Sequence, residues 1–310
     1  MGLPALTKIR ERFPNSRLTF LVGKSPASLL RQLNIGNEVI AVDRVALLRG
    51  RKLNSIREIF KLVRDIRRRR FDFVIDLHSL SETNILGFLS GARHRLYGNR
   101  ESRSLDFLGN FRPRPEREDK SKHLADYYLT VVAPLGIDAS RKGFRIEATK
   151  EDADAFIEKY FSDADGARLI GFVVGAGHPS RQWPLERFAE LSRRISATGG
   201  FKQVVFLGPE EEGLATEIHS RFGADVVVDA ELSIYQLLAV ARCLELLVGN
   251  DTGPTHIAAL AGTPIVLISD ERAPTKYVPL TDKINVIRTT RIEEISVDEV
   301  EEAVRSVIGR

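Results

Sequence analysis

The stretch that decides the fold is Leu246-Leu-Val-Gly-Asn-Asp-Thr-Gly-Pro-Thr-His256, which continues as Ile-Ala-Ala-Leu-Ala-Gly-Thr-Pro264. An apolar run stops at Gly-Asn-Asp, and a helical pattern begins with Pro254 in its first turn. Proline suits the first turn of a helix, and the free N–H groups of that turn attract anions. The stretch therefore predicts a strand-to-helix junction that can hold an anionic ligand.

Short apolar runs alternate with helical patterns on both sides of this stretch, which is typical of βαβ units and a mainly parallel sheet. We expect strands at Leu18–Val22, Glu38–Val42, Phe73–Leu77, Arg95–Tyr97, Leu169–Val174, Val204–Leu207, Asp225–Val228, Leu246–Val248 and Ile265–Ile268. We expect helices at Leu3–Phe13, Ala27–Leu33, Ile56–Arg68, Lys122–Val132 and Val297–Ile308, and after each of the first four strands of the second half. The predicted fold class is α/β, with two Rossmann-like domains.

The length of 310 residues favours two domains. A polar segment at Ser140–Glu151 leads into a charged helix at Glu151–Tyr160, so we place the boundary after residue 148. The N-terminal domain then spans residues 1–148 and the C-terminal domain spans residues 149–310. Two such domains would face each other across a cleft, and open α/β sheets bind ligands at the carboxyl ends of their strands.

Composition excludes several classes of protein. Hydrophobic residues make up 43% and charged residues 28% of the chain, and no apolar run is long enough to span a membrane. The first residues do not resemble a secretory signal, so we expect a cytoplasmic protein. The only cysteine, Cys243, cannot form an internal disulfide, and its apolar neighbours predict a buried side chain.

The formal net charge is +4, and a basic cluster contains Arg64 and Arg67–Arg70. Such a cluster can contact an anionic membrane surface or a phosphorylated substrate, although a solvated helix face explains it equally well. Nucleic acid is not an expected partner, because no nucleic-acid-binding signature is present.

Two further motifs follow predicted strands. In Gly175-Ala-Gly-His-Pro-Ser-Arg-Gln-Trp-Pro184, the glycines allow a ligand close to the backbone and Arg181 supplies a fixed cation. A plain turn with Trp183 packed inward is the alternative. In Leu207-Gly-Pro-Glu-Glu-Glu-Gly213, a carboxylate could bind a ribose diol. The alternative is that these acidic residues simply begin an ordinary helix, whose dipole they complement.

The opening motif also has a structural interpretation, in which Asp251 or Thr252 caps the helix that begins at Gly253. Capping and phosphate binding use the same helix end, so the two are compatible. Taken alone, His256 is better explained as a structural histidine.

Taken together, the three motifs resemble glycosyltransferase family 9, the heptosyltransferases, which transfer heptose from ADP-heptose to the inner core of lipopolysaccharide. Leu3-Pro-Ala-Leu6 through Arg12-Phe-Pro-Asn15 is similar to the first helix and turn of that family, and Asp72-Phe-Val-Ile-Asp-Leu-His78 to its mid-domain strand and acceptor-side loop. The resemblance implies the two-domain glycosyltransferase B fold and transfer with inversion of the anomeric centre. One carboxylate would then deprotonate the acceptor hydroxyl while hydrogen-bond donors stabilise the leaving diphosphate.

The resemblance also implies roles for individual residues. Arg181 would contact the donor diphosphate, Glu210 the adenosine ribose, and His256 would support the loop. The whole implied donor site consists of Gly177, Ser180, Arg181, Glu210, Asp251, Thr252, Gly253 and His256. The implied acceptor-side residues, which would meet a lipid-linked phosphorylated glycan, are Asp76, His78, Lys120 and Lys122.

Each acceptor-side residue has a structural alternative. Asp76 and His78 could simply cap the end of their strand, and Ser121 could cap a helix beginning beside the two lysines. No metal or other cofactor is expected, because Asp152-Ala-Asp154 and Asp163-Ala-Asp165 have metal-binding spacing but do not follow a strand.

One departure from the family concerns the amino terminus. There the resemblance implies a first strand and a Gly-Asp pair upstream of Met1, and that aspartate would be the catalytic base. We therefore expect an N-terminally truncated chain whose first strand is missing. Two alternatives stay open: a transferase of the same fold with another sugar nucleotide or acceptor, and a non-catalytic nucleotide-sugar binding protein.

Overall fold

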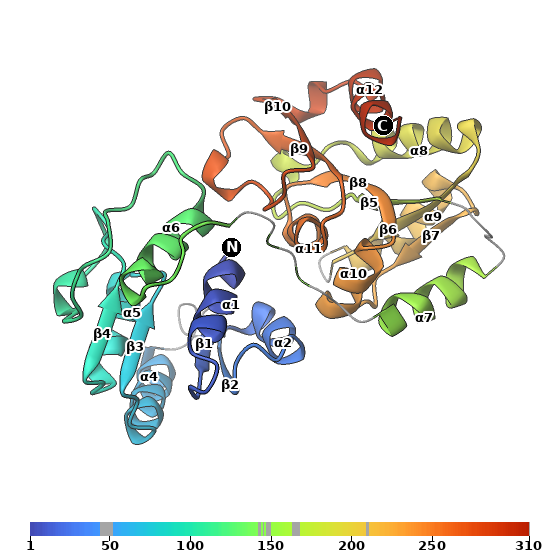
Figure 1. Ribbon diagram of the computed structural model, residues 1–310. Coiled ribbons are helices and arrows are strands. Elements are labelled where there is room, and N and C mark those ends of the chain that lie inside the picture. The colour runs from blue at the N-terminus through green and yellow to red at the C-terminus, as the bar shows by residue number, and fades with distance from the viewer. Residues whose placement is uncertain are drawn as a thin grey trace. The chain divides into compact units, whose positions relative to one another are not determined.

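The computed structural model describes residues 1–43, 52–141, 144, 146, 150–162, 168–208 and 211–309. Contacts divide the chain into two compact units, Met1–Phe144 and Arg145–Arg310, whose elements are labelled in Figure 1. Both units are α/β, as the sequence predicts. The boundary expected between residues 148 and 149 lies outside the described residues.

The C-terminal unit is built on one six-stranded sheet in which all neighbouring strands run parallel. Its strands are β5 (Arg168–Val173), β6 (Phe201–Phe206), β7 (Val226–Asp229), β8 (Leu244–Asn250), β9 (Ile265–Asp270) and β10 (Ile284–Thr289). The order in space is β10-β9-β8-β5-β6-β7, so the first strand of the unit lies near the centre. The chain winds to one side through β6 and β7, and then to the other side from β8.

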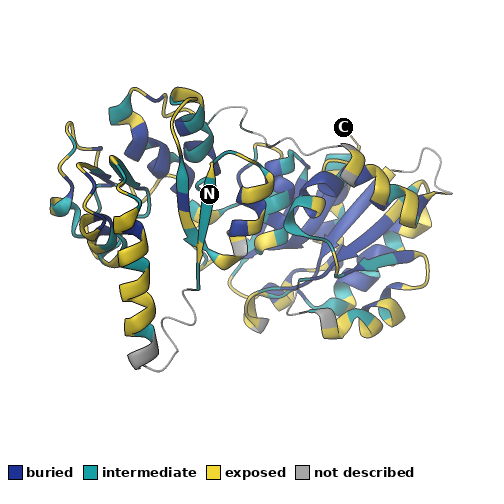
Figure 2. Ribbon diagram, turned by 90° about the horizontal axis from the view of Figure 1, so that it is seen from below, coloured by how far each residue is buried: buried dark blue, intermediate teal, exposed yellow. Residues whose placement is uncertain are grey.

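Helices cover both faces of this sheet, because successive residues of a strand point to opposite faces. On one face Ile170 and Phe172 belong to the apolar cluster of α8 (Leu185–Thr198), α9 (Ala215–Phe222) and α12 (Val297–Ile308). On the other face Leu169 and Val173 belong to the cluster of α7 (Lys150–Phe161), α10 (Ile234–Ala241) and α11 (Gly253–Ala261). Most of this sheet is accordingly coloured as buried in Figure 2, whereas the edge strand β10 is mostly half-buried.

The strand order has one consequence for ligand binding. Because β5 and β8 are neighbours and the chain leaves them in opposite directions, the sheet has its topological switch point between these two strands. The connections that follow neighbouring strands at such a point diverge to opposite faces and leave a crevice between them. The loops after β5 and β8, which contain two of the predicted motifs, therefore meet at this crevice.

The N-terminal unit contains two separate two-stranded parallel sheets. One pairs β1 (Thr19–Gly23) with β2 (Glu38–Val42), and the other pairs β3 (Phe73–Asp76) with β4 (His94–Tyr97). Its described helices are α1 (Leu3–Arg12), α2 (Lys24–Gln32), α4 (Lys52–Arg68), α5 (Ser81–Leu89) and α6 (Leu124–Val132). The apolar core of the unit is formed mainly by α1 and α6.

A groove of about 550 Å³ lies against both pairs of strands. It is lined by Leu18 and Thr19 on the side of β1, by Phe73 and Ile75 of β3, and by the apolar side chain of Ile9 of α1. Among the described residues no strand joins β1 to β3, whereas the corresponding centre of the C-terminal sheet is occupied by β5.

Several local predictions need correction. Helix α6 begins at Leu124 rather than Lys122, because the His123 ring accepts a hydrogen bond from the backbone N–H of Ala125 and forms the N-cap. Ser121 is therefore not the cap, and its hydroxyl donates to Asp119 instead. Helix α5 and strand β10 were not expected.

The prediction for Cys243 was also wrong. This residue is exposed, because it lies in the turn between α10 and β8 rather than inside either element. In the part of the chain that the structure describes, no helix is both long enough and apolar enough to cross a membrane.

Candidate functional site

Asn250 joins the two loops that meet at the switch point. It is the last residue of β8, and it is completely buried. Its Nδ2 donates to the carbonyl oxygens of Val174 (2.8 Å) and Gly175 (3.2 Å), and its Oδ1 accepts from the backbone N–H of Trp183 (3.1 Å). A buried amide with three such partners fixes the loop after β5 against the end of β8.

The loop after β5 carries Ser180 and Arg181 on a short 3-10 turn, η3 (Pro179–Arg181), and both residues are exposed. The Ser180 hydroxyl lies 2.8 Å from Nδ1 of His178. Trp183 anchors the loop, since its ring is buried and its Nε1 donates to the carbonyl of Ile295 at 2.9 Å. The inward packing of Trp183 is confirmed, and it leaves the exposed turn available for a ligand.

The first turn of α11 follows β8 directly. Thr252 occupies the N-cap position but makes no capping hydrogen bond through its side chain, so the prediction that it caps this helix is wrong. Its Oγ1 is buried and has no hydrogen-bond partner among the described residues. Nothing would obstruct a Cβ at Gly253, which means that the backbone there is open. This turn can offer N–H groups and a hydroxyl to an anion.

His256 lies on the same turn and its Nε2 is 3.1 Å from Oδ1 of Asp251. The two side chains are each 28% exposed. The contact fixes the orientation of the Asp251 carboxylate at the helix start. The structure thus brings together four of the predicted donor-site residues: Asp251, Thr252, Gly253 and His256.

The predicted ribose contact, Glu210, lies outside the described residues. Its neighbour Glu211 reaches the ends of two strands, because its Oε2 accepts a hydrogen bond from the backbone N–H of Gly208 at 2.9 Å after β6. A Cβ at Gly175, after β5, would collide with the same carboxylate. Sequence reasoning did not single out Glu211, although it belongs to the same run of three glutamates.

The end of β9, next to β8, adds a charged pair that the sequence interpretation missed. Asp270 is buried and its two carboxylate oxygens accept hydrogen bonds from Arg272, at 2.9 Å from Nε and 2.7 Å from Nη2. These bonds lower the pKa of Asp270 to about 2, and the positive charge of Arg181 contributes to that shift. The positive charge of Arg181 therefore acts on the carboxylate at the end of β9.

The residues predicted for the acceptor side lie in the N-terminal unit. Asp76 ends β3 and is buried, and its carboxylate accepts hydrogen bonds from the backbone N–H of Ser79 and from Nδ2 of Asn84, each at 2.8 Å. Burial raises the pKa of Asp76. His78 lies 3.0 Å from the hydroxyl of Tyr128 through its Nδ1. These contacts match the strand-end alternative for Asp76, because the carboxylate organises the turn that follows β3.

The two lysines assigned to the acceptor side are exposed and lie beside acidic residues. Nζ of Lys120 is 2.7 Å from Oε2 of Glu101, and Nζ of Lys122 is 3.9 Å from Oδ2 of Asp119. Exposed pairs of this kind contribute little to stability and exchange readily with other anions. The lysines thus remain accessible to a phosphate group.

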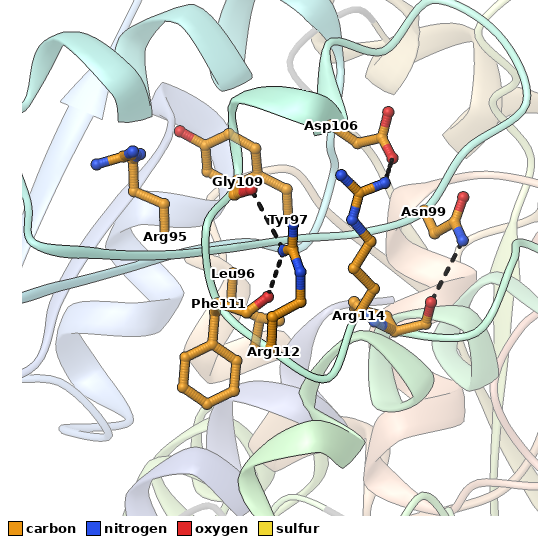
Figure 3. A pocket seen from close by; sticks show the side chains of 10 residues that line it. Arg95, Leu96, Tyr97, Asn99, Asp106, Gly109, Phe111, Arg112 and Arg114 are labelled. Carbon is orange, nitrogen blue, oxygen red and sulfur yellow. Dashed lines mark hydrogen bonds and ion pairs between the residues drawn. The ribbon is translucent and has the colours of Figure 1, made fainter.

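Other features do not form a donor site. The pocket in Figure 3, between Tyr97 and Arg112, has a volume of about 10 Å³, which is room for a water molecule and not for a sugar. No cluster of three or more histidine, cysteine, aspartate or glutamate side chains among the described residues could hold a metal ion. Asp163 and Asp165, the second pair with metal-binding spacing, lie outside those residues.

Comparison with known proteins agrees with this geometry. The family model described as glycosyltransferase family 9 (heptosyltransferase) matches residues 59–304. The chain belongs to this family. Family 9 chains are sugar transferases, and the match includes all three motifs at the ends of β5, β6 and β8.

Individual relatives of this family 9 chain are distant but cover most of its length. The lipopolysaccharide core heptosyltransferase OpsX of Haemophilus influenzae is 21% identical over 92% of this chain and 79% of its own length. The crystal structure of a family 9 glycosyltransferase from Veillonella parvula is 26% identical, with a TM-score of 0.78 over 99% of this chain and 93% of that one. Escherichia coli heptosyltransferase WaaC with ADP is 18% identical, with a TM-score of 0.77 over 99% and 95% of the two chains. The chain therefore has the glycosyltransferase B fold.

Proposed function

We propose that this chain transfers a heptose from ADP-heptose to a lipopolysaccharide core acceptor, with inversion of the anomeric centre. Membership of family 9 supports sugar transfer. The donor nucleotide is proposed from the relative whose structure contains ADP, and the acceptor from the relative that is a lipopolysaccharide core heptosyltransferase. The Asn250 junction supports the proposal most directly, because it fastens the loop that carries Arg181 to the end of the strand that leads into α11.

The donor would lie along the carboxyl ends of β5, β6 and β8. Arg181 would neutralise charge on the diphosphate, and the N–H groups of Gly253 and its neighbours would donate to phosphate oxygens. Asp251, held by His256 at 3.1 Å, would accept hydrogen bonds from hydroxyls of the donor sugar. Gly177 and Ser180 would border the diphosphate from the loop after β5.

A carboxylate of the turn after β6 would bind the adenosine ribose. Glu210 was expected in this role, and the position of Glu211 against Gly175 and Gly208 supports a contribution from its neighbour as well. Comparing Glu210→Gln with Glu211→Gln assigns the contact. The variant that lacks the ribose contact should weaken ADP binding by about tenfold, since a hydrogen bond to a charged group is lost.

In the proposed reaction a base removes the proton of an acceptor hydroxyl, whose oxygen forms a bond to the anomeric carbon. The bond from that carbon to the diphosphate breaks, and ADP leaves with the electron pair. Positive charge from Arg181 and the dipole of α11 would stabilise the leaving diphosphate. Asp76 is a poor candidate for the base, because its carboxylate is buried and already accepts two hydrogen bonds.

On the acceptor side, the accessible lysines Lys120 and Lys122 would contact phosphate groups of a lipid-linked glycan, with His78 and Asp76 organising the neighbouring loop. Such an acceptor is anchored in a membrane. We therefore propose a cytoplasmic enzyme that works at the inner face of the cytoplasmic membrane.

Calorimetry with ADP-heptose, UDP-sugars and GDP-sugars tests the donor assignment. We expect ADP-heptose to bind most tightly, and Arg181→Ala to weaken it while Arg193→Ala, an exposed arginine of the same unit, does not. Tighter binding of a UDP- or GDP-sugar would support another donor. Donor binding without heptose transfer to core acceptor would support a non-catalytic binding protein.

A further inference from the structure

Helix α4 (Lys52–Arg68) carries an apolar stripe that is only partly covered by protein. Towards the C-terminal end of the stripe, Ile66 is buried and Leu62 and Val63 are half-buried. Towards the N-terminal end, three large side chains at helical spacing are exposed: Ile56 (49%), Ile59 (47%) and Phe60 (70%). The stripe therefore leaves the core of the N-terminal unit and continues on its surface, where Figure 2 colours most of α4 as exposed.

The exposed side chains gather on one unit rather than over the whole surface. Helix α5, which packs beside α4, exposes Ile85, Phe88 and Leu89 to 38–47%, and Phe107 of η1 (Asp106–Leu108) is 66% exposed. Single exposed apolar residues are common, but a grouping of large ones marks an interaction surface. In the C-terminal unit the large hydrophobic side chains described as exposed are Leu214 and Tyr277, at 36% and 39%.

The charges of α4 indicate which partner fits this surface. The helix contains six basic and two acidic residues. Arg57, Lys61 and Arg64 are exposed and alternate in sequence with the exposed apolar residues. An apolar stripe bordered by lysine and arginine is the pattern of a helix that lies in the interface of an anionic membrane.

The basic cluster identified in the sequence contributes unequally to this surface. Arg69 is held by Glu38 at 2.5 Å and by Asp65 at 3.1 Å, so it mainly fastens the end of α4 to β2. Arg67 and Arg68 remain exposed. Outside the cluster, Arg57 is exposed, and Nζ of the exposed Lys61 lies 2.6 Å from Oε1 of Glu58. The positive charge available to a partner therefore comes mainly from Arg57, Arg64, Arg67 and Arg68.

We propose that α4 docks this unit on an anionic lipid bilayer, with Ile56, Ile59 and Phe60 inserted among the lipids and its basic residues on the headgroups. The free energy of inserting the apolar side chains adds to the electrostatic attraction of the basic residues. Each basic residue near the surface raises the affinity about fivefold. Docking would keep the enzyme beside a lipid-linked acceptor. Only this purpose of the docking rests on the proposed function; binding of α4 to the bilayer does not.

Vesicle flotation tests the proposal without donor or acceptor. The full chain is mixed with vesicles of phosphatidylcholine, with or without phosphatidylglycerol, and the bound fraction is measured. We expect binding to the anionic vesicles, falling by about tenfold or more for Ile56→Ser/Ile59→Ser/Phe60→Ser and for Arg57→Gln/Lys61→Gln/Arg64→Gln. The control Leu214→Ser/Tyr277→Ser, which removes exposed apolar groups of the other unit, should bind as the parent chain does.

Far-UV circular dichroism and a melting temperature, measured on each variant, show whether the chain remains folded. Equal binding to neutral and anionic vesicles, or unchanged binding of the apolar triple variant, would overturn the proposal. A dimer that the triple variant loses, without vesicle binding by the parent chain, would instead identify a second copy as the partner. Failure of heptose transfer would leave the vesicle result unaffected, so the two proposals fail separately.

Discussion

Replacing Asn250 with aspartate is the sharpest test of the switch-point junction. The substitution keeps the size of the side chain and keeps an oxygen to accept the N–H of Trp183. It removes the amide group that donates to the carbonyl oxygens of Val174 and Gly175. A neutral carboxylic acid can still donate to one of these carbonyls, whereas an ionised carboxylate donates to neither and is repelled by both.

The expected cost follows from these contacts. In the neutral form one buried acceptor loses its donor, which costs about 1–3 kcal/mol. In the ionised form a buried charge without a partner is added, and the total rises to about 3–5 kcal/mol. Burial raises the pKa of this carboxyl in the folded state above its unfolded value, so the relative stability of the variant is greatest at low pH. This relative stability is lost as the pH rises through the folded pKa, and the free energy of unfolding falls by at most about 1.4 kcal/mol per pH unit.

Trp183 provides the assay, because it is the only tryptophan in the chain and it is buried at this junction. Urea unfolding followed by tryptophan fluorescence reports the stability of the C-terminal unit at an acidic and at a neutral pH. Asn15→Asp, at an exposed position of the other unit, should change little at either pH. The role assigned to the junction would be refuted if the loss of unfolding free energy in Asn250→Asp did not grow with pH, or stayed below about 0.5 kcal/mol.

Four further outcomes are expected. Arg181→Ala should weaken ADP binding by about 10- to 100-fold in calorimetry, since a charge-assisted contact is lost. Arg181→Lys should have an affinity between those of Arg181→Ala and the parent chain. Thr252→Val should leave the urea midpoint unchanged or higher, because it removes a buried unpartnered hydroxyl, yet weaken ADP binding about fivefold. The hydrogen bonds from Arg272 lower the pKa of Asp270 from 3.8 to about 2, so the pair stabilises the folded chain fully above pH 3.8. This contribution is lost as the pH falls through about 2. The stability difference between the parent chain and Asp270→Asn should thus shrink in acid. A difference that does not change with pH would contradict the stabilising role of this pair. An apolar strand fused before Met1 should fill the groove beside β1 and β3 and raise the melting temperature, whereas an unchanged temperature would show that the groove does not accept a strand.

Local chemistry made the central part of the fold predictable. The junction at residues 246–256 was identified because glycine, asparagine and proline each restrict the backbone in a known way, and β8 and α11 lie where that pattern places them. The strand β10 was missed because it is an edge strand whose residues Ile284–Thr289 are mostly half-buried, so its apolar pattern is weak. Cys243 was misjudged because apolar neighbours in sequence belonged to two elements joined by an exposed turn.

The site was less predictable than the fold, because its contacts join residues far apart in the chain. The sequence offers three glutamates in a row and does not distinguish among them. The turn in which the Glu211 N–H donates to the Gly208 carbonyl brings the Glu211 carboxylate to the strand ends. The pair of Asp270 and Arg272 carries no motif at all. Its nearness to Arg181 depends on the position of β9 in the sheet.

The junction also explains why a helix end with several potential caps remains open to a ligand. Asn, Asp and Thr precede Gly253, and each could satisfy the first N–H groups of α11. The structure uses them otherwise: Asn250 holds the loop after β5, Asp251 pairs with His256, and Thr252 makes no capping bond. An uncapped helix start costs about 1 kcal/mol, which a phosphate bound at the same N–H groups would offset. If the donor binds as proposed, donor binding and the stability of the C-terminal unit are coupled at α11, because the phosphate would take the place of the cap.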